Sequence, residues 1–318
     1  MMAAISYPPI PLFDVGPLTL SLHGVFAAIG FMVGAWVATG EVRRRGLDTE
    51  AYQSALTWGL IGALIGARYL TTPAALFAGV PLLDALNPFG GNFSIMGGFV
   101  GGIVGGLLRM RKLGLPMLQT LDASSFGLAL GTVVGRIGDL AIVEHLGRPT
   151  TAAWGYGVKP GFDLAPQHDI LECTAAQALP SGFCPVPNLG SIAAGAQDGI
   201  YHHVAAYDLI GAGILLGVLY LVSRRFQLPV GRLFFLWVAW YGFQRFLLDS
   251  LRYGLGDATI GSFTWNQLSG LAAGVGGLVM MWAVGRWPQP EPATEVGSGE
   301  PDVDSEEPEV GSRQIEDD

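Results

Sequence analysis

Residues 18–39 read LTLSLHGVFAAIGFMVGAWVAT and contain no Asp, Glu, Lys or Arg. A helix that crosses a bilayer needs roughly 17 to 25 consecutive, mainly apolar residues, so this stretch is long enough. Six further stretches are similar, at residues 51–70, 93–108, 121–140, 203–222, 233–251 and 263–284. We therefore predict an all-α integral membrane protein, a bundle of seven transmembrane helices.

The composition supports this class. Of 318 residues, 50% are hydrophobic and only 14% are charged, with a mean hydropathy of +0.43, whereas soluble proteins carry about 25% charged residues. The net charge of −9 arises in residues 287–318, which hold 11 acidic residues and one basic residue. We expect residues 1–286 to form the membrane domain and residues 287–318 to be a disordered acidic tail. No basic patch suggests nucleic-acid binding.

The basic residues predict the orientation. Those in the short predicted loops lie on one side, and they are Arg43, Arg44, Arg45, Arg109, Arg111, Lys112, Arg224, Arg225, Arg232 and Arg286. The positive-inside rule makes this side cytoplasmic, which places the N-terminus outside and the C-terminus in the cytoplasm. The N-terminus lacks the basic region of a cleaved signal peptide. An insert at about 147–201 is then extracytoplasmic, where an oxidising compartment would favour a disulfide between Cys173 and Cys184.

Five charged residues fall in the outer halves of predicted spans. They are Arg68, Arg136, Asp139, Arg245 and Asp249. A charge at the bilayer centre costs at least about 2.5 to 3.5 kcal/mol, so such groups usually face a polar cavity and indicate function. The pairs Arg136 with Asp139 and Arg245 with Asp249 each share a helix face. Since guanidinium groups bind phosphate in a bidentate manner, we predict a pocket for an anionic phospholipid. The alternative is that the pairs are ion pairs that only fasten the bundle.

Other polar groups lie at the same depth. They are His23 in the first span, His202 and Tyr207 at the fifth and Gln267 at the seventh. Glu144 and His145 follow the fourth span, and His145 is either a base or a solvated loop residue. The glycines of the third span recur every four residues, a spacing that lets helices pack closely.

Four blocks of sequence carry a family resemblance. They are SLHGVFAAIGF at 21–31, IGARY at 65–69, GRIGDLAIVEHLGRPT at 135–150 and YGFQRFLLDSLR at 241–252. Together they resemble the bacterial prolipoprotein diacylglyceryl transferase family over roughly residues 12–282. Asp122 also matches a family Asp, and His202 with Tyr207 and Asp208 matches a His followed by Tyr-Glu.

Two positions depart from the family pattern. The third-span His-Gly-Gly motif, whose histidine is favoured as the catalytic base, is similar to SIMGG here, with Met96 followed by Gly97 and Gly98. The asparagine of the signature block is Asp139. A thioether cannot accept a proton at neutral pH, so either the base lies elsewhere or the chemistry is altered or lost.

The resemblance implies a phosphatidylglycerol–prolipoprotein diacylglyceryl transferase of the bacterial inner membrane. It would transfer the diacylglyceryl group to the lipobox cysteine of a prolipoprotein, form a thioether and release glycerol phosphate. No cofactor and no metal are expected.

The site residues follow from the resemblance together with their depth. Arg136 and Arg245 are expected to bind the headgroup and stabilise the leaving phosphate, with Arg68 as a weaker third ligand. Asp139 and Glu144 would orient arginines or glycerol hydroxyls, and Gly97 and Gly98 would line the lipid site. The candidate bases are His23 and His202, then His145.

Two other readings remain open. Met96 favours an inactive homologue that binds phospholipid or a signal peptide. A transporter would also place charges inside the membrane, but the inner halves of the spans hold few ionisable groups apart from Asp122.

Overall fold

The computed structural model describes most of the chain up to residue 288. The described residues are 4–10, 12–16, 18–70, 72, 76, 79–87, 95–144, 146–162, 175–184, 199–252 and 259–288. The chain divides into two units, Met1–Arg286 and Trp287–Asp318, and the fold below is that of the first unit.

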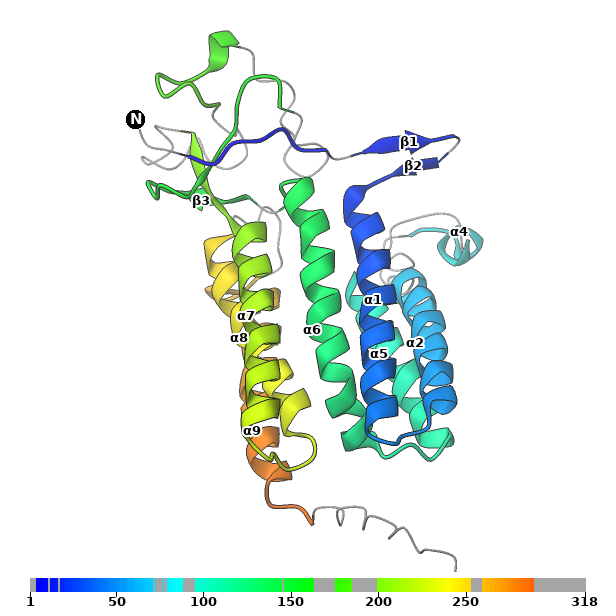
Figure 1. Cartoon of the computed structure of the whole chain (residues 1–318). Coiled ribbons are helices and arrows are strands. Elements are labelled where there is room, and N and C mark those ends of the chain that lie inside the picture. The colour runs from blue at the N-terminus through cyan, green and yellow to red at the C-terminus, as the bar shows by residue number, and fades with distance from the viewer. Residues whose placement is uncertain are drawn as a thin grey trace, which may run out of the picture. The chain divides into compact units, whose positions relative to one another are not determined.

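Among its described residues the first unit has seven long helices, and each overlaps one of the seven predicted segments. They are α1 (Leu22–Arg44), α2 (Thr49–Tyr69), α5 (Ile95–Lys112), α6 (Met117–Ala141), α7 (Val204–Arg225), α8 (Arg232–Leu251) and α9 (Trp265–Val284). Figure 1 shows them side by side, with β1, β2 and β3 at one end of the bundle. Three of the described helices, α1, α7 and α9, are both long and apolar enough to cross a membrane. The protein is therefore a mostly helical membrane protein.

Glycines set the closest helix contacts. A Cβ added at Gly66 of α2 would lie 2.1 Å from the Gly97 carbonyl oxygen of α5, and one at Gly34 of α1 would lie 2.6 Å from the Gly127 oxygen of α6. On α8, a Cβ at Gly242 would lie 2.3 Å from a backbone nitrogen of α9. No side chain fits at such distances, so the sequence builds three closely packed helix pairs.

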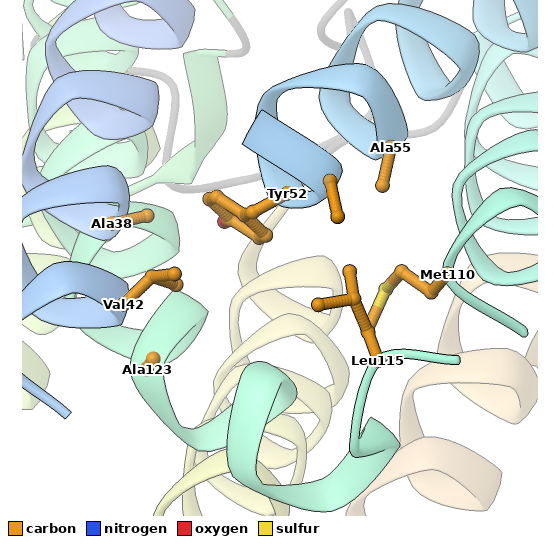
Figure 2. Packing of buried hydrophobic residues seen from close by; sticks show 8 residues of the cluster. Ala38, Val42, Tyr52, Ala55, Met110, Leu115 and Ala123 are labelled. Carbon is orange, nitrogen blue, oxygen red and sulfur yellow. The ribbon is translucent and has the colours of Figure 1, made fainter. Parts of the chain in front are cut away.

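The end of the bundle opposite the strands has an apolar core of its own. Helices α1, α2, α5 and α6 meet there around Ala38, Val42, Tyr52, Met110 and Leu115 (Figure 2). The Tyr52 hydroxyl forms a 2.8 Å hydrogen bond with the Ser124 hydroxyl of α6, so the polar atom in this core has a partner.

Asp122 fixes the start of α8 from the neighbouring α6. Its carboxylate accepts hydrogen bonds from the backbone N–H groups of Gly231 at 2.7 Å and Phe234 at 2.8 Å. These are orphan donors of the first turn of α8, and no side chain of the segment itself caps that helix. The buried charge thus positions the helix that carries Arg245.

Short strands complete the end of the unit where α1 begins and α6 ends. They are β1 (Phe13–Val15), β2 (Leu18–Leu20), β3 (Leu146–Pro149), β4 (Tyr156–Gly157), β5 (Ile200–His203), β6 (Thr259–Ile260) and β7 (Phe263–Thr264), beside the short helices α4 (Leu82–Leu86) and η1 (Ala175–Gln177). The sheet of the insert has the order β3-β5-β4, with both outer strands antiparallel to β5.

The strands correct two details of the prediction. The first helix begins at Leu22, because residues 18–20 pair with 13–15 in a hairpin. The insert also contains a sheet, which an all-α description omits. Cys184 is buried in this insert, whereas Cys173 lies outside the described residues, so their disulfide stays a prediction.

Candidate active site

The site forms where the start of α1 meets the end of α6. Gly138 permits this approach, because a Cβ there would lie 2.9 Å from the Cα of His23 and 2.9 Å from the Leu22 carbonyl oxygen. Ser21 caps α1 by accepting a hydrogen bond from the His23 backbone N–H at 3.2 Å. The imidazole of His23 is thereby held against the last turn of α6.

His23 contacts two carboxylates. Its Nδ1 lies 2.5 Å from Asp139 Oδ1 and 3.1 Å from Glu144 Oε2. The Asp139 side chain is 3% exposed and that of Glu144 10%, whereas the imidazole is 40% exposed. Nδ1 donates its hydrogen to Asp139 Oδ1, with Glu144 Oε2 close by, so the accessible Nε2 carries a lone pair in the neutral ring.

Arg136 joins this group to α7. Its Nη1 forms an ion pair with Asp139 Oδ2, and its Nε lies 3.0 Å from Asp208 Oδ2. The two acids hold two edges of the guanidinium, which fixes the plane of the group. In the described part of the chain, no bond is made by Nη2, so this nitrogen is available to a ligand.

Asp208 is itself held by α8. The Gln244 amide donates to Asp208 Oδ1 at 2.6 Å and to the Asp208 carbonyl oxygen at 3.0 Å. Trp240 Nε1 donates to Gln244 Oε1 at 2.9 Å, which sets the orientation of the amide. One chain of contacts thus runs from α1 through α6 and α7 to α8.

The other three charged positions of the predicted spans form no bond with this chain of contacts among the described residues. Arg68 is buried and donates to the carbonyl oxygens of Asn87 at 2.8 Å and Ala85 at 3.1 Å, so it holds the segment around α4. Asp249 is buried and accepts from the Thr264 hydroxyl, the N-cap of α9. Within the described residues, half-buried Arg245 makes neither a hydrogen bond nor an ion pair. An Arg245–Asp249 ion pair is therefore not formed.

The other sequence candidates have different surroundings. His202 Nδ1 lies 3.1 Å from the Tyr207 hydroxyl, and burial lowers the pKa of His202. Gly97 is buried against α2. A Cβ added at Gly98 would lie 3.5 Å from the Ala67 Cβ. His145 lies outside the described residues. Met96 is in α5, and its side chain is not among the described ones.

A metal ion would have three ligands here. Single ligand atoms of His23, Asp139 and Glu144 all lie within 4.8 Å of one another. The guanidinium of Arg136 already neutralises part of the Asp139 charge, and the imidazole bonds directly to Asp139. Direct hydrogen bonding among the side chains therefore accounts for the cluster by itself.

Sequence reasoning missed two members of the network. Asp208 was noted only as part of a Tyr-Asp pair, and Gln244 was not singled out. A glutamine between Phe243 and Arg245 in an apolar span was the available signal, because an amide in a membrane needs a partner.

Comparison with known proteins identifies the family. The model of the prolipoprotein diacylglyceryl transferase family matches residues 11–283. The chain belongs to this family. The family accounts for the multi-pass membrane architecture, and its identification confirms the resemblance that the four sequence blocks indicated.

Curated relatives from this family are distant. The chain is 28% identical over 265 residues to a protein of Frankia alni, covering 82% of the chain and 62% of that relative. It is 29% identical over 254 residues to one of Mycobacterium tuberculosis, covering 78% of the chain and 51% of the relative. Both relatives are named phosphatidylglycerol–prolipoprotein diacylglyceryl transferase. The chain thus spans between half and two thirds of their length.

Proposed function

We propose that this member of the family transfers the diacylglyceryl group of phosphatidylglycerol to the lipobox cysteine of prolipoproteins. It does so as a multi-pass protein of the bacterial inner membrane, with seven spans, an extracytoplasmic N-terminus and a cytoplasmic tail. The observation that carries the proposal is the contact of His23 with Asp139, which Arg136 also binds, because it puts a proton acceptor and a fixed cation at one place.

The two arginines share the phosphate. Arg136 is fixed by Asp139 and Asp208 and offers Nη2, while Arg245 on α8 forms no hydrogen bond or ion pair with the residues that the structure describes. As the bond between the glycerol carbon and the phosphate oxygen breaks, negative charge grows on the leaving glycerol phosphate. Donors fixed beforehand stabilise that charge strongly in a site from which water is excluded.

His23 serves as the base in place of the missing third-span histidine. A thiol with a pKa near 8.5 is only a few per cent thiolate at neutral pH and needs activation. The proton of the cysteine thiol passes to His23 Nε2, and the thiolate sulfur attacks the glycerol carbon. Asp139 and Glu144 on Nδ1 stabilise the imidazolium that forms and keep the ring oriented.

A transfer assay read by mass spectrometry tests the proposal. Purified protein is mixed with phosphatidylglycerol vesicles and a lipobox peptide, and a peptide with Ser in place of Cys is the control. We expect a diacylglyceryl mass gain on the cysteine peptide alone. His23→Gln should abolish it, while His202→Gln and His145→Gln should retain it. Full turnover by His23→Gln would refute the base assignment, and no gain beside an active family enzyme would refute the activity.

A binding-only homologue is the second candidate, and Met96 is the feature that favours it. Such a protein would bind phosphatidylglycerol vesicles or a signal peptide with no mass gain on the peptide. Replacing Met96 with His separates the two cases, because activity that appears only in Met96→His would show that the base had been lost.

A further inference from the structure

Val143 adopts a backbone conformation that valine rarely takes. Its φ is +53°, and it alone among the described residues other than glycine has a positive φ. A β-branched side chain in this left-handed region is strained, and such strain persists only where the surroundings enforce it. The residue is also fully buried.

The strained turn brings Glu144 back to the site. Residue 143 follows the C-cap of α6, and the next backbone N–H, that of Glu144, donates to the Asp139 carbonyl oxygen at 2.8 Å. The Glu144 carboxylate consequently reaches His23 Nδ1 at 3.1 Å. An extended residue at position 143 would carry the chain away from α6, so the position of Glu144 depends on this turn.

The N-terminal segment holds the end of α6 just before the turn. We name residues 5–10 the N-terminal strap. The Tyr7 hydroxyl donates to the Leu140 carbonyl oxygen at 2.6 Å, and the Ile10 N–H donates to the Ala141 carbonyl oxygen at 3.0 Å. Both acceptors belong to the last turn of the helix, and the Leu140 oxygen also accepts a bond from the Val143 N–H at 3.1 Å.

The strap is itself anchored on the sheet of the insert. Ile5 pairs in parallel with Tyr156, through an Ile5 N–H bond to the Gly155 oxygen at 2.9 Å and a Gly157 N–H bond to the Ile5 oxygen at 2.9 Å. The Tyr156 hydroxyl donates to the Tyr7 carbonyl oxygen at 2.5 Å. The strap thus links a rigid sheet to the end of α6.

His203 completes the anchor. Its Nε2 lies 2.7 Å from the Tyr7 hydroxyl oxygen, and because that hydroxyl gives its hydrogen to Leu140, the imidazole must be the donor. Tyr7 also packs against the buried cluster that contains Val143, Tyr156 and Tyr201. Hydrogen bonding and packing therefore act on the turn together.

We propose that the N-terminal strap is a positioning device for Glu144, in which Tyr7 enforces the left-handed turn at Val143. Tyr7 is a positioning residue, since it touches neither His23 nor Arg136 through any bond in the described part of the chain. The expected effect of this turn on the transfer rate rests on the proposed function. The structural coupling of Tyr7 to Val143 does not.

Tyr7→Phe, Val143→Gly and their combination test the coupling. Glycine adopts a positive φ without strain, so it should form the turn without the strap. Val143→Ala is the matched control, because it removes both γ-methyl groups but keeps the Cβ, which is itself disfavoured at a positive φ. Hydrogen exchange at the Glu144 amide is measured in the full-length protein, together with transfer to the lipobox peptide.

We expect Tyr7→Phe to speed exchange at the Glu144 amide about tenfold and to lower kcat by a similar factor, with KM for phosphatidylglycerol changed less than about twofold. Val143→Gly in the Tyr7→Phe background should restore both to within about threefold of wild type, and Val143→Ala should restore both much less. Unchanged exchange in Tyr7→Phe, or equal rescue by alanine, would overturn the proposal. If the wild type transfers nothing, the proposed function fails, and the exchange data still decide the coupling.

Discussion

Replacing Asp122 should loosen the start of α8. The carboxylate accepts bonds from the Gly231 and Phe234 N–H groups at 2.7 and 2.8 Å, and Asp122 is 4% exposed. Asp122→Ala leaves the buried Gly231 donor and the partly buried Phe234 donor without this partner, and an unsatisfied buried donor costs about 1 to 3 kcal/mol. The expected loss is about 2 to 6 kcal/mol, which corresponds to a fall in Tm of about 5 to 15 °C for a chain of this size.

Thermal unfolding of the full chain in lipid nanodiscs measures this loss. Asp122→Asn keeps one oxygen for one donor, so its Tm should fall about halfway between wild type and Asp122→Ala. Asp84→Ala, at an exposed position in α4, is the control and should leave Tm unchanged. An Asp122→Ala variant that unfolds within about 1 °C of wild type would show that water or backbone rearrangement supplies the missing acceptors, and the capping role would be wrong.

Three further predictions concern other elements. Arg136→Lys should lower transfer about 100-fold with little change in Tm, because an ammonium cannot contact Asp139 and Asp208 together; transfer near the wild-type level would contradict this. Burial lowers the pKa of His203 from 6.5 to about 4. Between these pH values only the unfolded state binds a proton at this residue. The folded state therefore loses about 3 kcal/mol of stability as the pH falls from 6.5 to 4. His203→Gln should flatten that part of the pH–stability curve, and an unchanged curve would contradict the assignment. Gly66→Ala should separate α2 from α5 and destabilise the protein, while Gly217→Ala on α7, where an added Cβ meets no atom within 4 Å, should be neutral; equal Tm values for the two variants would be the contrary result.

Hydropathy predicted the helices because it reports a local property. Each of the seven predicted segments overlaps one long helix, since a run of apolar residues of bilayer length has few alternatives to a helix. The errors lie at the ends of the predicted spans, where contacts with other segments determine the secondary structure. Residues 18–20 were assigned to the first span, but they form a strand because residues 13–15 lie alongside them.

Spacing along a helix predicted one contact and not the other. Arg136 and Asp139, three apart, form an ion pair. Arg245 and Asp249, four apart, do not, and Asp249 instead accepts a hydrogen bond from the Thr264 hydroxyl at the start of α9. The residue spacing within one helix does not predict a partner on another helix. For the same reason the sequence predicted neither the Asp208–Gln244 contact nor the turn at Val143.

The acidic residues of the network give Arg136 and Arg245 different roles. Asp139, Glu144 and Asp208 bring three negative charges to a place where Arg136 is the permanent cation, so a proton on His23 reduces an existing imbalance. The acids therefore stabilise the imidazolium form of His23, the more strongly where the dielectric constant is low. The same acids occupy Arg136, which leaves it only part of its capacity for an incoming phosphate. Arg245, with no bond to an acid among the described residues, then supplies the net positive charge that the leaving glycerol phosphate requires.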